Sequence, residues 1–288
     1  MPINSIFMRF PGGLAKCLTL SYDDAVMEDF RLVEIMKKHG LRGTFNINSG
    51  LYRPHEKCLL PTEGTGHRMS VEMATELFSQ DGIEPAVHAH MHSHLQTQPP
   101  AQVAYEIMKN REVLEEQFGK IVRGMAYPFG TCACTDQVVE VLKNCGITYA
   151  RTTVSTEKFS IPTDWLRMPA TCHHKNPRLG ELTTAFLEKR VSSGAEPLLF
   201  YLWGHSYEFE NDQNWEIIEH FAEQMGDRDD IWYATNDELY EYVEAFRSLV
   251  FASNMRYVQN PSAKTVCFTL RAKPYTVAPG ETLKLDLN

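Results

Sequence analysis

Short apolar runs alternate along the chain with longer segments in which apolar residues recur at helical spacing. Apolar runs of four to eight residues are typical of buried strands, and the longer segments are typical of amphipathic helices. The runs predict strands at residues 17–22, 43–48, 84–88, 124–127, 147–151, 165–168, 198–203 and 231–234. The amphipathic segments predict helices within residues 27–40, 70–78, 99–119, 135–146 and 214–226.

This alternation of strands and helices favours parallel strands joined by crossover helices. With about seven or eight strands, a closed barrel fits better than an open sheet. We therefore predict an α/β fold, a (β/α) barrel of about seven parallel strands, over residues 1–249. Residues 250–288 lose the helical pattern and predict a small β-rich C-terminal appendage of two or three strands. It would shield one edge of the barrel, or contact substrate or a second subunit.

The composition narrows the class of partner. The 288 residues are 43% hydrophobic and 23% charged, which is ordinary for a globular chain, and the net charge is −9. An acidic chain is a poor partner for nucleic acid or an anionic membrane. No apolar run is long enough to span a bilayer, and the N-terminus has no secretory pattern. The seven cysteines then read as reduced thiols and predict a cytoplasmic location, with an extracellular one left open.

Two adjacent carboxylates, Asp23 and Asp24, follow the first predicted strand. Neighbouring strand residues point to opposite sides, so the pair could simply begin a loop. It could equally form a site in which one carboxylate holds a metal ion and the other moves a proton.

Four of the eleven histidines, His88, His90, His92 and His94, fall within seven residues after another predicted strand. Alternate histidines would share one face of a strand, whereas an i, i+4 pair would share a face of a helical segment. Two histidines and a carboxylate are a known ligand set for catalytic zinc, and an aspartate of the early pair would complete it. The alternative is a solvated histidine-rich loop.

Two further segments carry weaker signals. A strongly apolar strand ends at His205, which could protonate a leaving amine from the carboxyl edge of the barrel. The turn at residues 126–130 could aim a backbone N–H at a developing oxyanion. The cysteine pair at 132 and 134 and the Thr-Cys-His-His segment at 171–174 could bind a soft metal ion, but both are interpreted as structural or incidental.

In their order along the chain, these motifs resemble the polysaccharide deacetylase family, the NodB-homology carbohydrate esterases. The family carries an Asp-Asp pair, then His-x-x-x-His, an Arg-x-Pro-x-Gly turn, an Asp-Trp segment and a late histidine. The resemblance covers roughly residues 15–245. The matching positions here are Ser21 to Ala25, His88 to His92, Ala126 to Gly130, Asp164-Trp165 and Leu202 to Ser206.

The resemblance implies a distorted (β/α) barrel that holds one divalent metal ion, usually zinc. The family frame Glu-x-x-x-His-x-x-x-His-x-x-Leu fits Glu84, His88, His92 and Leu95, so His88 and His92 would be metal ligands. It also implies Asp24 as the third ligand and Asp23 as the base that deprotonates a metal-bound water. The Phe129 backbone N–H would help to hold the oxyanion and His205 would be the acid. His90 and His94 would lie beside the site or at the surface.

One departure concerns the arginine that opens the family's turn motif, because that position is Ala126 here. Arg151 and Arg167, both near strand ends, are the candidates to supply the missing charge next to Asp23. Without such a neighbour the pKa of Asp23 would rise. Further contacts with the site or the substrate are predicted at Tyr127, Arg151, Asp164, Trp165 and Arg167.

The chemistry implied is metal-dependent hydrolysis of a carbon–nitrogen bond in a non-peptide amide, as in N-deacetylation of a saccharide. The substrate would be a small molecule or an oligosaccharide, and assembly into a homo-oligomer remains open. One alternative is a related barrel hydrolase that acts on a non-sugar amide, a cyclic imide or a ureide. Another is a non-catalytic carbohydrate-binding domain.

Overall fold

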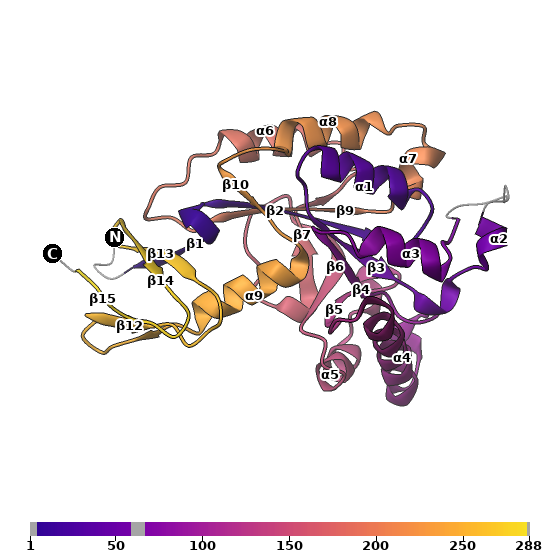
Figure 1. The fold of residues 1–288 in the computed structure, drawn as a ribbon, viewed down its shortest axis with the longest axis horizontal. Helices are drawn as coiled ribbons and strands as arrows, with labels where there is room; N and C mark the ends of the chain where they lie inside the picture. The colour runs from indigo at the N-terminus through magenta and orange to yellow at the C-terminus, as the bar shows by residue number, and fades with distance from the viewer. Residues whose placement is uncertain (1–4, 59–66, 287–288) are drawn as a thin grey trace.

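The computed structural model describes residues 5–58 and 67–286, and its centre is a barrel of parallel strands (Figure 1). The strands lie in the order β7-β6-β5-β4-β3-β2-β9-β8. Only Thr171 separates β7 from β8, so the two ends of this path are consecutive in the chain and the sheet closes. The strands are β2 (Lys16–Asp23), β3 (Gly43–Ile47), β4 (Ile83–Val87), β5 (Gly124–Ala126), β6 (Tyr149–Ser155), β7 (Met168–Ala170), β8 (Cys172–His173) and β9 (Leu198–Gly204).

The predicted barrel is therefore confirmed, with β7 and β8 together acting as its seventh strand. A short further strand, β10 (Ile231–Tyr233), pairs with the first three residues of β2. These residues precede Leu20, at which the pairing of β2 with β3 begins. The predicted strand at 165–168 is wrong in its bounds. Asp164 accepts a hydrogen bond from the Leu166 N–H and starts a 3-10 turn, so β7 begins only at Met168.

Strand β2 explains why the inside of the barrel is polar. Its residues Leu18 and Leu20 belong to the large hydrophobic cluster outside the barrel, which the helices also join. Successive side chains of a strand alternate between the two faces, so Thr19 and Ser21 point the other way. Arg151 Nε on β6 lies 3.2 Å from Ser21 Oγ, although three strands separate β2 from β6 along the sheet. This contact therefore crosses the interior of the barrel.

Helices cover the outside of the barrel (Figure 1). The helices at 27–40, 70–78, 99–119, 135–146 and 214–226 were predicted, and each is found within two residues of its expected bounds. Two helices of at least ten residues, α6 and α9, were not predicted. The helices are α1 (Asp29–Lys38), α2 (His55–Cys58), α3 (Val71–Phe78), α4 (Pro100–Phe118), α5 (Asp136–Asn144), α6 (Leu179–Glu188), α7 (Tyr207–Asn211), α8 (Glu216–Met225) and α9 (Asn236–Arg247).

The first residues of α9 close the end of the barrel at which the strands β3 and β4 begin. The backbone N–H of Asn236 donates to Thr44 Oγ1 at 2.9 Å, and that of Asp237 donates to Glu84 Oε2 at 3.0 Å. These bonds satisfy amides that a helix N-terminus otherwise leaves without partners. Glu84 also accepts hydrogen bonds from the side chains of Thr44 and Tyr149. Burial and the neighbouring Asp237 raise the pKa of Glu84 to about 7.

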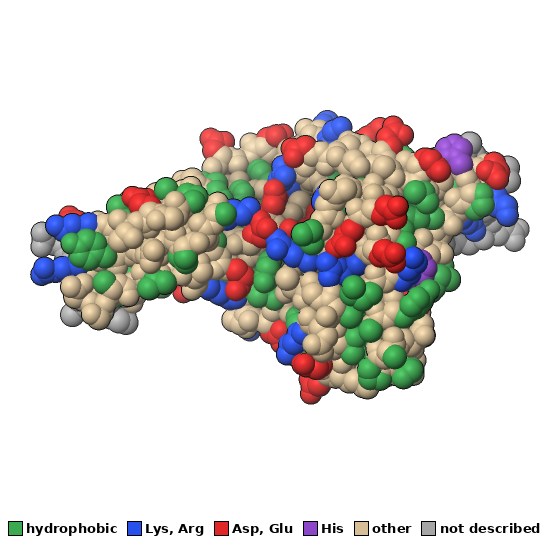
Figure 2. Space-filling view, turned by 60° about the horizontal axis from the view of Figure 1, so that its bottom comes forward, with side chains coloured by type: hydrophobic (Ala, Val, Ile, Leu, Met, Phe, Trp, Pro, Cys, Tyr) green, Lys and Arg blue, Asp and Glu red, His purple; other side chains and the backbone are tan. Residues whose placement is uncertain are grey.

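The appendage is larger than predicted. Two small antiparallel sheets, β1-β13-β14 and β11-β12-β15, extend from the barrel as a narrow arm (Figures 1 and 2). The N-terminal strand pairs with β13, so the arm is built from both ends of the described chain. Its strands are β1 (Ile6–Arg9), β11 (Val250–Phe251), β12 (Tyr257–Gln259), β13 (Val266–Leu270), β14 (Lys273–Val277) and β15 (Thr282–Lys284). Among the described residues, every helix is too short or too polar to cross a membrane.

Candidate active site

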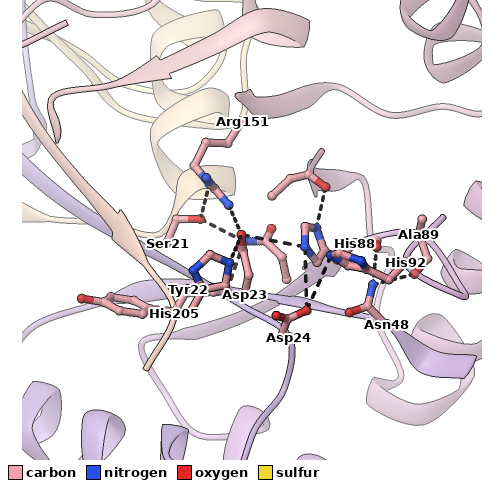
Figure 3. Close-up of polar contacts among 12 residues, drawn as sticks. Ser21, Tyr22, Asp23, Asp24, Asn48, His88, Ala89, His92, Arg151 and His205 are labelled. Carbon is pink, nitrogen blue, oxygen red and sulfur yellow. Dashed lines mark hydrogen bonds and ion pairs between the residues drawn. The ribbon is translucent and has the colours of Figure 1, made fainter. Parts of the chain in front are cut away.

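Asp23 and Asp24 lie at the carboxyl end of β2, where the chain leaves the barrel (Figure 3). Asp23 is the last residue of the strand and points into the interior, while Asp24 has a φ of 91° and turns the chain away. The Asp24 backbone N–H donates to the carbonyl of Asn46 at 2.9 Å, which holds this turn against β3. The two neighbouring carboxylates therefore meet different surroundings.

Asp23 is buried in a cage of donors. Arg151 Nη2 pairs with Asp23 Oδ2, and Asn46 Nδ2 donates to Asp23 Oδ1 at 2.8 Å. His88 Nε2 and His205 Nε2 each lie 3.8 Å from Asp23 Oδ2. Burial alone would raise the pKa of Asp23, but the charge of Arg151 outweighs it and holds the pKa well below the usual range. Asp23 is consequently a carboxylate at neutral pH.

Arg151 supplies the positive charge that the family motif led us to expect at position 126. Ala126 on β5 and Arg151 on β6 are paired residues in the register of the sheet. Paired residues on neighbouring strands carry their side chains on the same face of the sheet. The positive charge thus comes from the strand next to the one that carries position 126, and it still reaches Asp23. Arg167, the other candidate, pairs with Asp136 and Asp164 at the surface.

The histidine tract begins one residue after β4 and does not continue as a strand. Positive φ values at Ala89 (58°) and His92 (51°) bend the chain, and Asn48 Nδ2 donates to the carbonyls of His88 and Ala89. This bend brings the rings of His88 and His92 together, with centroids 4.9 Å apart. His90 instead bonds to Ser49 Oγ at 2.9 Å, through Nδ1.

Asp24, His88 and His92 present three atoms that could hold a metal ion, all within 4.8 Å of one another. His88 Nδ1 lies 2.8 Å from the carbonyl of Ala126, to which it must donate, so the lone pair of His88 is on Nε2. His88 Nε2 and His92 Nε2 lie 4.0 and 3.8 Å from Asp24 Oδ1.

The protonation of these three residues suits a cation. Burial lowers the pKa of His88, and burial together with His88 lowers that of His92 to about 4, so both rings are neutral at pH 7. Asp24 Oδ1 is buried without a hydrogen-bond partner, although Arg68 Nη2 forms an ion pair with it at 2.8 Å. Arg68 more than offsets the effect of burial and lowers the pKa of Asp24. Two neutral imidazoles and one carboxylate match the donor set of an open zinc site.

Phe129 lies in the turn after β5, against the histidine tract. Its ring is 4.6 Å from that of His92 and stacks on His94 at 3.6 Å between centroids. Phe129 has a φ of 58°, and Gly130, at 71°, continues the tight turn. About half of the Phe129 side chain is exposed, so this turn forms a rim beside the three candidate ligands.

His205 follows β9 and faces Asp23 from the opposite side of the barrel to His88 (Figure 3). Its Nδ1 lies 3.5 Å from Glu208 Oε2. Burial lowers the pKa of His205, but the Glu208 contact and the charges of Asp23 and Asp24 prevail and raise it. Ser206 fixes the loop, because its hydroxyl donates to the buried carboxyl of Asp29 on α1.

Glu208 is the residue of this region that the sequence reasoning missed. Its carboxylate contacts His173 and His174, in the Thr-Cys-His-His segment that was interpreted as structural or incidental. That segment passes along β8, which pairs with β9 and so runs beside His205. A glutamate three residues after the late histidine was the available signal.

The other candidate contacts do not reach Asp23 or the three candidate ligands. Tyr127 donates to the carbonyl of Leu166, and Trp165 Nε1 donates to Glu244 on α9. Asp164 caps the 3-10 turn and pairs with Arg167. These residues fasten the segment before β7 to its surroundings.

In comparisons with known proteins, the first part of the chain is similar to one family. Residues 12–150, slightly less than half of the chain, match the family described as polysaccharide deacetylase. This stretch includes the aspartate pair, the histidine tract, and strand β5 with the turn that follows it, so it agrees with the resemblance drawn from the sequence. No curated protein matches the chain.

The solved structures to which this chain is similar are distant in sequence, and the first described here shares the fold. A protein assigned as a polysaccharide deacetylase from Mycobacterium smegmatis is 15% identical over 84% of this chain and 95% of its own, with a TM-score of 0.58. The deacetylase PplD of Streptococcus pyogenes, in complex with acetate, is 20% identical over 52% of this chain, with a TM-score of 0.43. This chain spans only 61% of the length of PplD. A pseudoenzyme of the CE4 family from Bacillus anthracis is 18% identical over 81% of this chain and 68% of its own, at a TM-score of 0.46.

Proposed function

We propose that this chain, which matches the polysaccharide deacetylase family over residues 12–150, is a metal-dependent hydrolase that removes the acetyl group from an N-acetylated saccharide. One observation carries the proposal. A single oxygen, Asp23 Oδ2, lies 3.8 Å from both His88 Nε2 and His205 Nε2. A candidate base therefore sits between a candidate metal ligand and a candidate acid, as amide hydrolysis requires.

Asp23 is suited to accept the proton of the attacking water. Arg151 and Asn46 hold its carboxylate in one orientation and keep it ionised. A carboxylate with a depressed pKa is a weak base, so the water it deprotonates must itself be made more acidic. Asp24, His88 and His92 would hold a divalent cation, which lowers the pKa of water and polarises the amide carbonyl when it is bound.

His205 is suited to donate the second proton. It stays protonated to higher pH than an ordinary histidine, and its Nε2 faces the same space as Asp23 Oδ2. Donation to the amide nitrogen would let the amine depart as a neutral group. The Phe129 backbone N–H, at the rim formed by its turn, would stabilise the oxyanion. The products would be acetate and a free amino sugar.

Acetate release and metal content test this proposal together. Purified protein would be assayed on acetylated chito-oligosaccharides, peptidoglycan fragments, and simple amides, cyclic imides and ureides, with Asp23→Asn as the control. We expect one bound divalent ion per chain, acetate release from a saccharide, and almost none from Asp23→Asn. Turnover confined to the non-sugar compounds would replace the proposal by the alternative hydrolase. Saccharide binding without any turnover would identify a binding domain.

A further inference from the structure

Three imidazole rings converge on the carboxylate of Glu208. His174 Nε2 lies 3.0 Å, His173 Nε2 3.1 Å and His205 Nδ1 3.5 Å from Glu208 Oε2. The backbone N–H of His205 also donates to this oxygen at 3.4 Å. Two of these rings come from β8 and its end, the third from the loop after β9, and the carboxylate from α7. Two parts of the chain, residues 173–174 and residues 205–208, thus meet at one oxygen atom.

From this geometry we infer that Glu208 is a positioning residue for the reaction proposed above: it orients His205 and keeps it protonated, while His173 and His174 hold Glu208 in place. The inference rests on the proposed function in assigning His205 as the acid. Its structural content, a fixed carboxylate on Nδ1 of that ring, is independent of the substrate.

The two nitrogens of His205 have separate partners. Nδ1 faces Glu208 Oε2 at 3.5 Å, and Nε2 faces Asp23 Oδ2 at 3.8 Å. A carboxylate beside Nδ1 favours a proton on that nitrogen and stabilises the imidazolium, as in other carboxylate–histidine pairs. The proton on Nε2 is then the one that can leave, and it points to the space beside the base.

Glu208 itself remains an anion. Burial would raise its pKa, but the close contacts with the three histidines outweigh burial and hold the pKa well below the usual range. Lys175 Nζ, 3.5 Å from Glu208 Oε1, adds a positive charge on the other oxygen. The negative charge next to His205 is therefore present throughout the pH range in which that histidine titrates.

The same three residues could also be considered as a second metal site, since His173, His174 and Glu208 offer ligand atoms within 4.8 Å of one another. The hydrogen bonds argue against it. His173 Nδ1 accepts the backbone N–H of Lys175 at 3.1 Å, so in a neutral ring the hydrogen is on Nε2. Nε2 then donates to Glu208 and has no lone pair for a cation. The ammonium group of Lys175 lies on the same carboxylate.

The charged groups that face His205 come from two elements. Asp23 and Asp24 face it from the end of β2, and Glu208 faces it from α7. The rings of His173, Trp203 and Tyr207 complete its surroundings, at 5.2 to 6.3 Å between centroids. Arg151 and Arg68 already pair with the two aspartates. The two aspartates near His205 are therefore paired with arginines, whereas Glu208 contacts mainly histidines, so its charge is the one that acts most directly on His205.

The test is Glu208→Gln, with Glu210→Gln as the matched control. Glu210 lies on the same short helix and bonds to Trp215, away from His205. In metal-loaded protein, histidine side-chain NMR would follow the titration of His205. We expect its pKa to fall by about one pH unit or more in Glu208→Gln and to stay unchanged in Glu210→Gln. The alkaline limb of kcat should move by the same amount, with metal content unaltered.

A second variant separates charge from local disruption. Glu208→Asp keeps the negative charge, and the pKa of His205 should return toward that of the wild type. An unchanged pKa in Glu208→Gln would overturn the inference, and so would the loss of one metal ion out of two, which would identify a second metal site. Because the NMR titration needs no substrate, it stands even if no amide is hydrolysed, a result that would count against the proposed function alone.

Discussion

Replacing Arg151 by alanine should destabilise the folded protein and impair catalysis, and a second substitution should rescue both. Arg151 is 1% exposed and its partner Asp23 is 3% exposed, so the variant leaves a buried carboxylate without its cation. Breaking a buried ion pair in this way costs about 3–5 kcal/mol. A domain is usually stable by about 5–15 kcal/mol, so Arg151→Ala should be severely weakened.

The register of the sheet supplies the rescue. Ala126 and Arg151 are paired residues on β5 and β6, about 4.8 Å apart between strands, with side chains on the same face. An arginine at 126 can therefore use the space that Arg151→Ala vacates. We expect Ala126→Arg/Arg151→Ala to recover most of the lost stability, whereas Ala126→Arg alone forces two cations into one space and destabilises the protein.

Urea unfolding of the four proteins gives the interaction energy between the two positions as a double-mutant cycle, and we expect several kcal/mol. The same proteins would be assayed for acetate release over pH. In Arg151→Ala, the largest effect that opposes burial is removed and the pKa of Asp23 rises, so activity should be lost from the acid side first. Arg167→Ala is the control, because its ion pairs are exposed and worth about 1 kcal/mol or less. Additive effects at 126 and 151 would refute the reasoning.

Three further predictions follow from the same geometry. His88→Ala and His92→Ala should each lose the bound metal ion and all measurable acetate release, whereas His90→Ala, whose ring faces Ser49, should keep most of both; mass spectrometry of metal content checks this, and retention of the metal by His88→Ala would contradict the ligand set. Removing the metal with a chelator should abolish turnover reversibly and leave the circular dichroism spectrum nearly unchanged, since Arg68 already pairs with Asp24; global unfolding would contradict this. Burial and Asp237 raise the pKa of Glu84 from 4.5 to about 7 in the folded chain, so the folded state binds this proton more tightly and the free energy of unfolding should fall by up to about 3 kcal/mol as pH rises through that interval. Glu84→Gln should remove this decline in urea titrations at pH 5 and pH 8, and an equal decline in the variant would show that other groups cause it.

Much of the candidate site could be predicted because of one property of parallel barrels. The residues after each strand gather at one edge, so Asp23, Asp24, His88 and His205 could be grouped without knowing any distance. Arg151 could be proposed but not chosen over Arg167, because the choice depends on which residues of β5 and β6 lie opposite each other.

Other features depended on alternation or on long-range pairing. Thr19 and Ser21 stand within what was interpreted as an apolar run, yet they line the polar inside of the barrel together with Arg151. The hydrogen bond from the Leu166 N–H to Asp164 starts a 3-10 turn, so the strand predicted from residue 165 begins only at Met168. Glu208 acquires its role only because β8 brings His173 and His174 beside the loop after β9. The spacing of Glu208 and His205 is visible in the sequence, but no local pattern predicts that His173 and His174 contact the same carboxylate.

The pairing of β1 with β13 sets an order of events during synthesis. Ile6 pairs with Leu270, about 260 residues later, so β1 emerges from the ribosome long before its partner exists. The barrel strands can pair during this interval, whereas Met8 and Phe10 must wait for Tyr242, whose hydroxyl joins the Arg9 carbonyl to the Cys267 N–H. We therefore expect the arm to form late in folding, and its formation fixes both ends of the described chain to the barrel.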